Sequence, residues 1–493
     1  MNIIDISIFI LYFLAMLGVG IYFFRKNQDS EDYYVGGRNM GSLHIGLSVV
    51  ATDVGGGFSI GLGGLGFLMG ISGSWMLFTG LIGAWLSAVF LIPKVSHLSR
   101  HHKWFTFPQL FQHFYNSRVA LVAGIISAIG YIGFTSSQLL AGAKLASATF
   151  LELDLNIALM IMGVIAVGYT VIGGLKAVIY TDTIQWIILM GGLVFIGIPI
   201  GYTAIGGIDA IKATLSPDFL SLGNISWSTF FNWIVTIVPI WFVGMTLYQR
   251  IYACRDEKTA RRAWFIAGLF EYPVMAFMGV LLGLFARVGA EQGMFAYAGF
   301  PTAEGIDAEM GLPMLLRTVL PVGLMGLMLS AYFSAIMSTA DSCLMAASGN
   351  VVTDILGRLS NFGKNKNTAL RLSQIATLVI GVISLLLASM MQNVLELMLL
   401  SYAFMVSGLF VPVVGALFWK RGNSLAAFWA MLVGGGTTIA LVISEFSLPY
   451  NLDPNVAGIS LSALTFISLS LLTTEKRGSG DIRNETEIEA LTN

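Results

Sequence analysis

Apolar stretches long enough to cross a lipid bilayer follow one another along almost the whole chain. A hydrocarbon core of roughly 30 Å requires about 20 apolar residues in one helix. The chain is 56% hydrophobic and 11% charged, with a mean hydropathy of +0.80, whereas soluble domains carry about 25% charged residues. Because backbone polar groups in lipid must be satisfied within their own segment, we expect an all-α polytopic membrane protein.

The spacing of these stretches predicts about 13 transmembrane helices, and the basic residues indicate their orientation. With the N-terminus outside, 22 of the 26 Lys and Arg residues fall in cytoplasmic loops or the C-terminal tail, as the positive-inside rule requires. We therefore predict a multi-pass protein of the plasma membrane, in bacteria the inner membrane, with a cytoplasmic C-terminus. The predicted spans are 4–24, 42–70, 74–93, 119–150, 156–173, 178–204, 227–252, 262–288, 314–356, 369–391, 394–419, 425–446 and 455–473.

The remaining composition argues against several classes of protein. A net charge of −1 gives no basic surface for a nucleic acid, and two cysteines, Cys254 and Cys343, provide neither a disulfide framework nor metal-ligand spacing. The five histidines lie near predicted inner span ends and accompany no nucleophile motif, so we expect no enzyme. The expected partners are a small-molecule solute and the lipid bilayer, and the expected state is a monomer.

A polar cluster interrupts the apolar stretch from Leu320 to Val352, whose single formal charge is Asp341. The segment reads SAIMSTADS, and a helix would bring its small and hydroxylated residues to one face at i, i+3, i+4 and i+7. Hydroxyl, carboxylate and carbonyl oxygens are the ligands that hard cations prefer. The sequence therefore predicts a cation site formed by Ala335, Ser338, Thr339 and Ser342, with Asp341 at its edge.

Two further carboxylates lie inside predicted spans. Asp53 precedes the triple glycine Gly55-Gly56-Gly57, and Asp182 follows Lys176 by less than two helical turns. A charged group at a helix centre costs roughly 2.5–3.5 kcal/mol on insertion scales, so a compensating cation is expected. Helix unwinding at the glycines would free backbone carbonyls of Ala51 and Val54 for coordination.

Besides the triple glycine in the second span, the seventh span is interrupted by Pro239 and Gly244. Two broken helices in corresponding positions predict an inverted-repeat transporter with its site at the membrane midplane. Three other isolated charges have different interpretations. Glu396 and Lys144 lie near span ends and are expected to reach the headgroups, whereas Glu271 is left open as a proton or cation relay or as a partner of broken-helix backbone.

The chain resembles the sodium:solute symporters over about residues 1–475. The resemblance rests on the segments GGLKAVIYTDTIQ, SAIMSTADS and DYYVGGRNMG, and on the pair Gln249-Arg250. It implies a leucine-transporter-like five-helix inverted repeat. The expected division is an extra span and cytoplasmic loop in 1–41, the first half in 42–204, an outer loop in 205–226, the second half in 227–419, extra spans in 420–474 and a disordered cytoplasmic tail in 475–493.

The resemblance also implies ligands for sodium, the expected cofactor. Carbonyls of the second span and a carbonyl with two hydroxyls of the ninth form the common sodium site of such symporters. The matching residues here are Ala51, Val54, Ala335, Ser338 and Thr339, with Asp53 in support. A second sodium site, found in some members, would use Asp182, Ser338, Asp341 and Ser342.

The expected solute is a small organic molecule, an amino acid such as proline or a related zwitterion or monocarboxylate, taken into the cell by alternating access. The ATDVGGG segment resembles the choline branch, but residues aligned with its tryptophans are Asp53 and Gly244. Alternatives are proton coupling through Asp53, Asp182 and Glu271, or a transporter-like sensor or channel. The candidate residues around the solute are Gly55, Phe58, Phe78, Gln138, Trp241 and Phe242.

Overall fold

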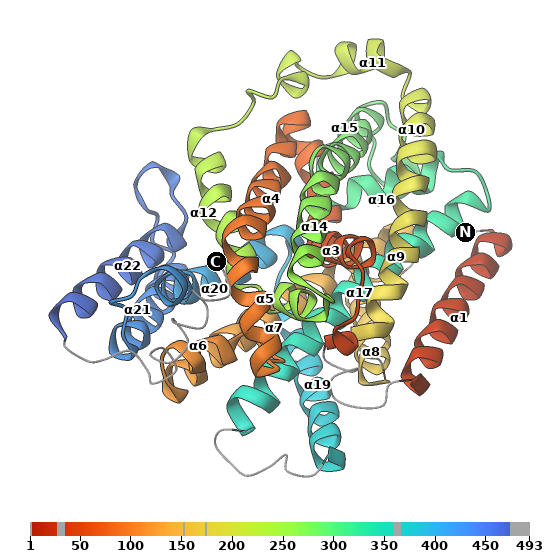
Figure 1. Ribbon diagram of the computed structural model, residues 1–493. Helices are drawn as coiled ribbons and strands as arrows, with labels where there is room; N and C mark the ends of the chain where they lie inside the picture. The colour runs from red at the N-terminus through yellow and green to blue at the C-terminus, as the bar shows by residue number, and fades with distance from the viewer. Residues whose placement is uncertain (1, 27–34, 151–152, 173–174, 358–365, 474–493) are drawn as a thin grey trace.

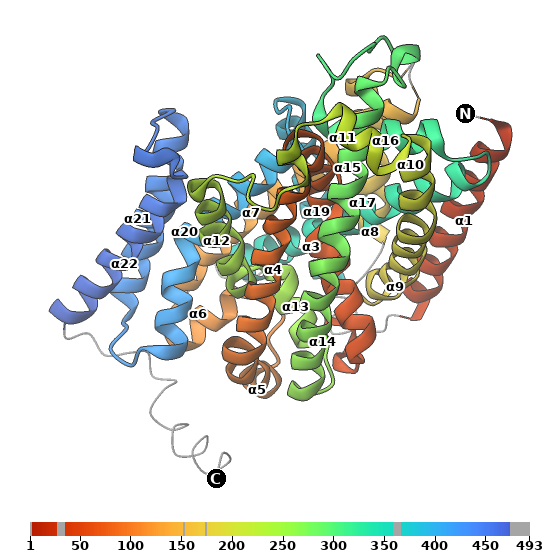
Figure 2. The same ribbon diagram turned by 90° about the horizontal axis from the view of Figure 1, so that it is seen from above.

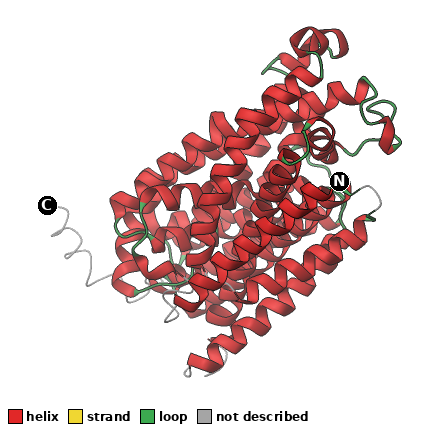
Figure 3. Ribbon diagram, turned by 90° about the vertical axis from the view of Figure 1, so that its right-hand side faces the viewer, coloured by secondary structure: helices red, strands yellow, loops and turns green. Residues whose placement is uncertain are grey.

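The computed structural model describes residues 2–26, 35–150, 153–172, 175–357 and 366–473. Within these ranges the chain forms helices joined by loops and no strand (Figure 3). The prediction of an all-α protein is therefore confirmed. The predicted tail, 475–493, lies outside the described residues.

The helices alternate in direction along the bundle, and several are joined by π-helical turns into longer rods. The membrane-length helices begin with α1 (Ile3–Lys26), α3 (Ser42–Met69), α4 (Trp75–Leu86) with α5 (Ile92–His102), α7 (Ser117–Thr149), α8 (Leu155–Ile172) and α9 (Leu175–Gly192) with α10 (Ile198–Ala204). The second set comprises α12 (Trp227–Val243), α13 (Met245–Ala253), α14 (Glu257–Leu269) with α15 (Ala276–Glu291), α17 (Leu324–Gly349), α19 (Lys366–Ser389), α20 (Val394–Phe418), α21 (Ser424–Ile443) and α22 (Pro454–Leu472). Shorter helices are α6 (Pro108–Phe114), α11 (Gly207–Thr214) and α16 (Ala308–Val319).

Among the described residues, nine helices are long and apolar enough to cross a membrane, or ten when the bent pair α12 and α13 counts as one span. Three shorter apolar helices, at Ile3–Ala15, Ser42–Thr52 and Leu155–Gly168, coincide with further predicted spans. The chain is thus a polytopic membrane protein by the length and composition of its helices.

One predicted span was wrong in its extent. The sequence predicted a single span over 314–356, but α16 ends at Val319 and α17 begins at Leu324. Pro321 has no N–H to continue a helix, and Gly323 has φ +89°, a left-handed conformation that favours glycine. The apolar run hid this turn because hydropathy does not report backbone geometry.

Both predicted helix interruptions are present. Gly55 has φ +33° and ψ −157°, which breaks α3 near its middle. Gly244 separates α12 from α13, and the two helices meet at a bend of 43°. Each break leaves backbone groups that the helix itself cannot satisfy, so neighbouring elements must supply partners.

The helix that carries the SAIMSTADS segment lies in the interior of the bundle. In the most apolar stretch of α17, 89% of the residues are buried, against 28% in α22. Helix α17 packs against α3, α7 and α9. In Figures 1 and 2, α1 lies at one edge of the bundle and α21 with α22 at the opposite edge, beside α20. The central position of α17 brings its polar face against the break in α3.

Candidate cation and solute site

Oxygen atoms of α3 and α17 meet at the break in α3. The Thr339 hydroxyl donates to the carbonyl oxygen of Ala51 at 3.0 Å and lies 3.3 Å from that of Ala335. A Cβ on Gly55 would lie 2.8 Å from Oγ1 of Thr339, so only glycine allows this approach. The predicted ligands Ala51, Ala335 and Thr339 are thus brought together, and their oxygens fit a hard cation. Asp53, Val54 and Phe58 belong to the same segment, but their side chains lie outside the described part of the chain.

Gln138 of α7 also supports the broken backbone of α3. Its Oε1 accepts a hydrogen bond from the backbone N–H of Gly56 at 2.6 Å. A Cβ on Gly55 would lie 2.7 Å from the same oxygen. Gln138 was predicted to line the solute pocket; the structure places it beside Gly55, with its carbonyl group already used by an N–H that the helix break leaves free.

A buried ion pair between α9 and α13 contacts α17 at Ser338 and Ser342, next to Thr339. Nη2 of Arg250, on α13, is 3.6 Å from Oδ2 of Asp182, on α9, and both side chains are fully buried. Asp182 also accepts hydrogen bonds from Ser338 and, at 2.5 Å, from Ser48 of α3. The carboxylate therefore joins α3, α9, α13 and α17, and the guanidinium compensates its charge.

The guanidinium has partners on three helices. Nε donates to Ser48 at 3.1 Å, and Nη2 donates to Thr52 at 2.5 Å and to Ser342 at 3.0 Å. Nη1 donates to the carbonyl of Thr246 at 3.2 Å. Arg250 lies near the end of the predicted span 227–252, and the structure places it in α13 with its side chain fully buried. Its sequence signal was a lone arginine at the end of an apolar span, which does not reveal the distant carboxylate.

The four residues predicted to hold a second cation each form a hydrogen bond, and two of them bond to each other. Ser338 donates to Asp182, whereas Ser342 accepts from Arg250. Asp341 accepts a 2.5 Å hydrogen bond from Thr170 of α8. Thr170 was not predicted from the sequence, because a threonine in an apolar span gives no specific signal. The structure therefore places these four side chains on one stretch of α17 and α9, each in a defined hydrogen bond.

The predicted aromatic residues of the solute site whose side chains are described each pack against other aromatic rings. Phe78 lies edge-on to Trp75 and Tyr272, with ring centroids 5.1 and 5.2 Å apart. The Trp241 ring is fully buried against Gly83 of α4 and near Trp264 of α14. Phe242 faces Phe410 of α20 at 5.8 Å. Trp241 and Phe242 connect α12 to α4, α14 and α20, whereas Phe78 packs on α4 and on the π-helical turn at Tyr272. Of the described residues predicted to line the solute site, Gly55 and Gln138 lie directly at the helix break.

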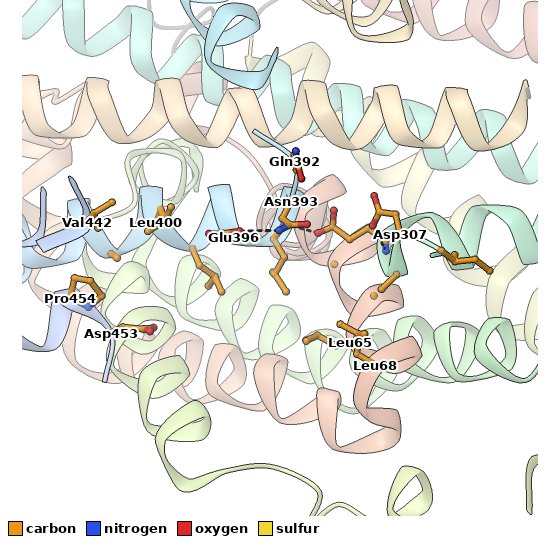
Figure 4. A pocket seen from close by; sticks show the side chains of 18 of the residues that line it. Leu65, Leu68, Asp307, Gln392, Asn393, Glu396, Leu400, Val442, Asp453 and Pro454 are labelled. Atoms are coloured by element: carbon orange, nitrogen blue, oxygen red, sulfur yellow. Dashed lines mark hydrogen bonds between the residues drawn. The ribbon is translucent and has the colours of Figure 1, made fainter. Parts of the chain in front are cut away.

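A cavity of about 830 Å³ opens above the site, between α3, α16, α20, α21 and the start of α22. Its walls are mostly apolar, and Gly61 and Gly64 form its α3 side. Asn393 and Glu396 face it from the start of α20 (Figure 4). None of its described lining residues is Lys, Arg or His. Its acidic lining residues are Asp307, Glu309, Glu396 and Asp453.

Lys144 of α7 is a further correction to the sequence analysis. It was expected to extend to the headgroups, but its side chain is 1% exposed. Nζ lies 2.6 Å from a carboxylate oxygen of Asp307 and 2.6 Å from one of Glu309. The Glu309 carboxylate also accepts from the backbone N–H groups of Val394 and Leu395 at 2.9 Å each. One buried network thus joins α7, α16 and the N-terminus of α20.

Glu271 is buried in the π-helical turn between α14 and α15, where Tyr272 departs from helical geometry. Its Oε2 lies 2.6 Å from the position that a Cβ of Gly80 would occupy. Glycine at position 80 therefore gives the carboxylate the space it takes against α4. Glu396, by contrast, accepts from Asn393 at 3.0 Å at the exposed start of α20.

Comparison with known proteins gives one family over most of the chain. The model of the sodium:solute symporter family matches residues 33–434. The high-affinity proline transporter of Bacillus subtilis is 27% identical over 471 residues, an alignment that covers 93% of this chain and 96% of the transporter. The sodium/pantothenate symporter of Escherichia coli is 26% identical, with 92% and 94% covered.

Solved structures give the fold. The structure of a Na⁺-coupled sialic acid symporter in a substrate-bound, outward-open state has a TM-score of 0.80 at 23% identity and covers 97% of this chain and 99% of that chain. A nucleobase-cation-symport-1 family transporter in a closed conformation has a TM-score of 0.53 at 13% identity, with 90% and 95% covered. The predicted leucine-transporter-like fold is confirmed.

The ion pair of Asp182 and Arg250 predicts strong coupling between the two side chains. Removing one partner leaves an unpaired buried charge, so Asp182→Asn or Arg250→Gln should each destabilise the protein by about 3–5 kcal/mol. The double variant should lose clearly less than the sum of the two single losses. Thermal unfolding of the purified protein measures all four members of this cycle. Additive losses would contradict the pairing, and Glu257→Gln, at an exposed ion pair with Arg261, is the control expected to change little.

Proposed function

Because the chain belongs to the sodium:solute symporter family, we propose that it carries a small zwitterionic solute, such as proline, into the cell by alternating access. Family membership makes it a sodium-coupled transporter in the membrane and not an enzyme. The solute, the ion ligands and the direction of transport are the proposal. The observation that carries it is the meeting of the Thr339 hydroxyl and the Ala51 carbonyl at the break in α3.

We assign the sodium ion to the oxygens of Ala51, Val54, Ala335, Ser338 and Thr339. Three of these oxygens lie together, because the Thr339 hydroxyl contacts the carbonyl oxygens of both Ala51 and Ala335. A sodium ion here would be coordinated by lone pairs of the same oxygens, with the hydroxyl proton of Thr339 turned away from it. Ser338 supports the assignment because it reaches Asp182, which brings negative charge to within one turn.

Coupling between ion and solute follows from the element that they share. Sodium would fix the two halves of α3 at Gly55, and the same break presents Gly55 and Gln138 to the solute. Two ligands that stabilise one conformation must each raise the affinity for the other by the same factor. The membrane potential adds about 2.3 kcal/mol per charge for every 100 mV, which favours inward movement of the ion.

The charges around the outer cavity favour a solute with a positive group. Its acidic lining residues attract cations, and the nearby ammonium of Lys144 is already occupied by Asp307 and Glu309. An anionic solute would meet no free cationic group among the described lining residues, whereas the amine of a zwitterion would be attracted. Two relatives in Bacillus subtilis transport proline, which is such a zwitterion.

Proton coupling is the alternative, through Asp53, Asp182 and Glu271. In the structure Asp182 pairs with Arg250 at 3.6 Å, so this carboxylate already has a fixed charged partner. Uptake measured across pH in the absence of sodium distinguishes the two couplings. Uptake that continues without sodium and increases as the external pH falls would favour proton coupling.

The sodium assignment predicts that Thr339→Ala and Ser338→Ala raise the sodium concentration for half-maximal uptake by roughly tenfold, the equivalent of about 1.4 kcal/mol. The maximal rate of uptake should change less, because alanine at position 338 or 339 leaves the packing of α17 against its neighbours in place. Ser330→Ala is the matched control, since Ser330 lies on the same helix and donates to the carbonyl of Gly326. If both site variants keep the wild-type sodium dependence, the ligand assignment is wrong.

A second sodium ion at Asp182, Ser338, Asp341 and Ser342 is tested by the ratio of sodium to solute flux. Such an ion would replace Arg250 as the counter-ion of Asp182, because the guanidinium and the site share Ser342. We expect two sodium ions per solute in the wild type and one in Asp341→Ala. A ratio of one that Asp341→Ala leaves unchanged removes the second ion.

The solute class predicts the outcome of a thermal-shift screen. A ligand at 100 times its dissociation constant stabilises the folded state by about 2.7 kcal/mol. Proline or a related zwitterion should therefore raise the melting temperature in sodium and much less in potassium. Pantothenate and sialic acid, both anions, should have little effect. Stabilisation by an anion without any response to zwitterions would contradict the proposed solute class.

A further inference from the structure

The N-terminus of α17, the helix of the proposed sodium site, has no capping side chain of its own. The residue before the helix is Gly323, and no polar side chain occurs in the preceding Leu320, Pro321 and Val322. The first four N–H groups of any helix lack partners within that helix. In an apolar surrounding each such group is costly, so another element must supply the acceptor.

Asp5 of α1 supplies it from more than 300 residues away. Its Oδ1 accepts hydrogen bonds from the backbone N–H of Gly323 at 2.7 Å and of Gly326 at 2.9 Å. The side chain is fully buried. A carboxylate at a helix N-terminus gains from the helix dipole as well as from charge-assisted hydrogen bonds. Asp5 is therefore the N-terminal cap of α17, contributed by a different helix.

The backbones of α1 and α17 approach closely at the same point. A Cβ on Gly326 would lie 2.7 Å from both Cα and the carbonyl oxygen of Asp5. Two turns further along, the rings of Phe9 and Phe13 lie 5.7 and 5.4 Å from that of Phe333, each edge-on. The contact thus extends along the outer half of α17 and holds it in one register against α1.

This contact leads directly to the proposed ion ligands. Phe333 is followed by Ser334, which accepts from Gln185 of α9 at 2.9 Å, and then by Ala335, a proposed sodium ligand. From Gly326 to Ala335 the helix rises about 14 Å without a break. Helix α1 also packs against α9, which carries Asp182. A shift of α17 at its outer end would therefore move Ala335 and Thr339 relative to Ala51 of α3.

We propose that Asp5 is a positioning residue for sodium: by capping α17 it holds the ligand oxygens of that helix in the register that binds the ion. The inference rests on the proposed sodium site. Asp5 does not touch the ion, and α1 is then part of the coupling machinery although it lies at the edge of the bundle (Figures 1 and 2). A functional site needs its ligands held within about 0.5 Å, and the cap fixes one end of the helix that carries Ala335, Ser338 and Thr339.

The test compares Asp5→Asn with Asp256→Asn in sodium-driven uptake and in thermal unfolding. Asparagine keeps an acceptor oxygen at position 5 but removes the charge. Asp256 caps α14, where it accepts from Thr259 at 2.6 Å, so it is a matched cap on another helix. We expect Asp5→Asn to raise the half-saturating sodium concentration roughly tenfold, the size of one charge-assisted hydrogen bond, and Asp256→Asn to leave it unchanged.

A second pair of variants tests the same contact without altering the carboxylate. Gly326→Ala places a methyl group against the backbone of Asp5 and should also weaken sodium binding. Gly18→Ala, in α1, meets no described atom within 4 Å and should not. The melting-temperature gain on adding sodium, relative to potassium, should fall in Asp5→Asn and Gly326→Ala.

The outcomes separate this inference from the proposed function. A wild type whose uptake ignores sodium would overturn both. A sodium-dependent wild type in which Asp5→Asn and Gly326→Ala keep the wild-type sodium affinity would overturn the inference alone. An equal loss of melting temperature in sodium and in potassium, with unchanged sodium affinity, would reduce Asp5 to a structural cap and would equally reject the proposal.

Discussion

The break in α3 at Gly55 is the constraint on which the rest of the site depends. A helix inside a bilayer satisfies its own backbone, and a break is tolerated where protein groups replace the lost bonds. Here Gln138 accepts the N–H of Gly56, and Thr339 donates to the carbonyl of Ala51. Helices α7 and α17 therefore both have to reach this break, and they pack against each other beside it. The same carbonyls and hydroxyl that repair the helix are the groups that a hard cation would bind.

Buried charges follow the same logic at two levels of the bundle. Asp182 is compensated by Arg250 near the break, and Lys144 by Asp307 and Glu309, which line the cavity between α3, α16 and α20. Each group connects helices that are distant in the sequence, so each fixes their relative positions as well as balancing charge. Placing an ion in lipid costs several kcal/mol, and both networks recover that cost by satisfying the ion with several partners. The buried polar networks thus fix the relative positions of the helices, whereas apolar side chains make up most of the buried residues.

Periodicity within one helix was sufficient to find the polar face of α17, because residues at i, i+3, i+4 and i+7 share a side whatever surrounds the helix. Glycine and proline likewise located the breaks at Gly55 and Gly244. Long-range pairing was not accessible in this way. The sequence gives no indication that Arg250 meets Asp182 or that Asp5 caps α17, since the partners lie far apart along the chain. The turn between α16 and α17 was missed because an apolar run conceals a change of direction.

The enclosure of Lys144 has a practical consequence. Its ammonium group is held between two carboxylates and is 1% exposed, so an amine-reactive reagent applied to the folded protein cannot reach it in this arrangement. The reaction requires an accessible nitrogen, and Lys144 becomes accessible only when α16 separates from α7. The rate at which Lys144 is modified, compared with the rate at the exposed Lys212, therefore measures how often α16 separates from α7.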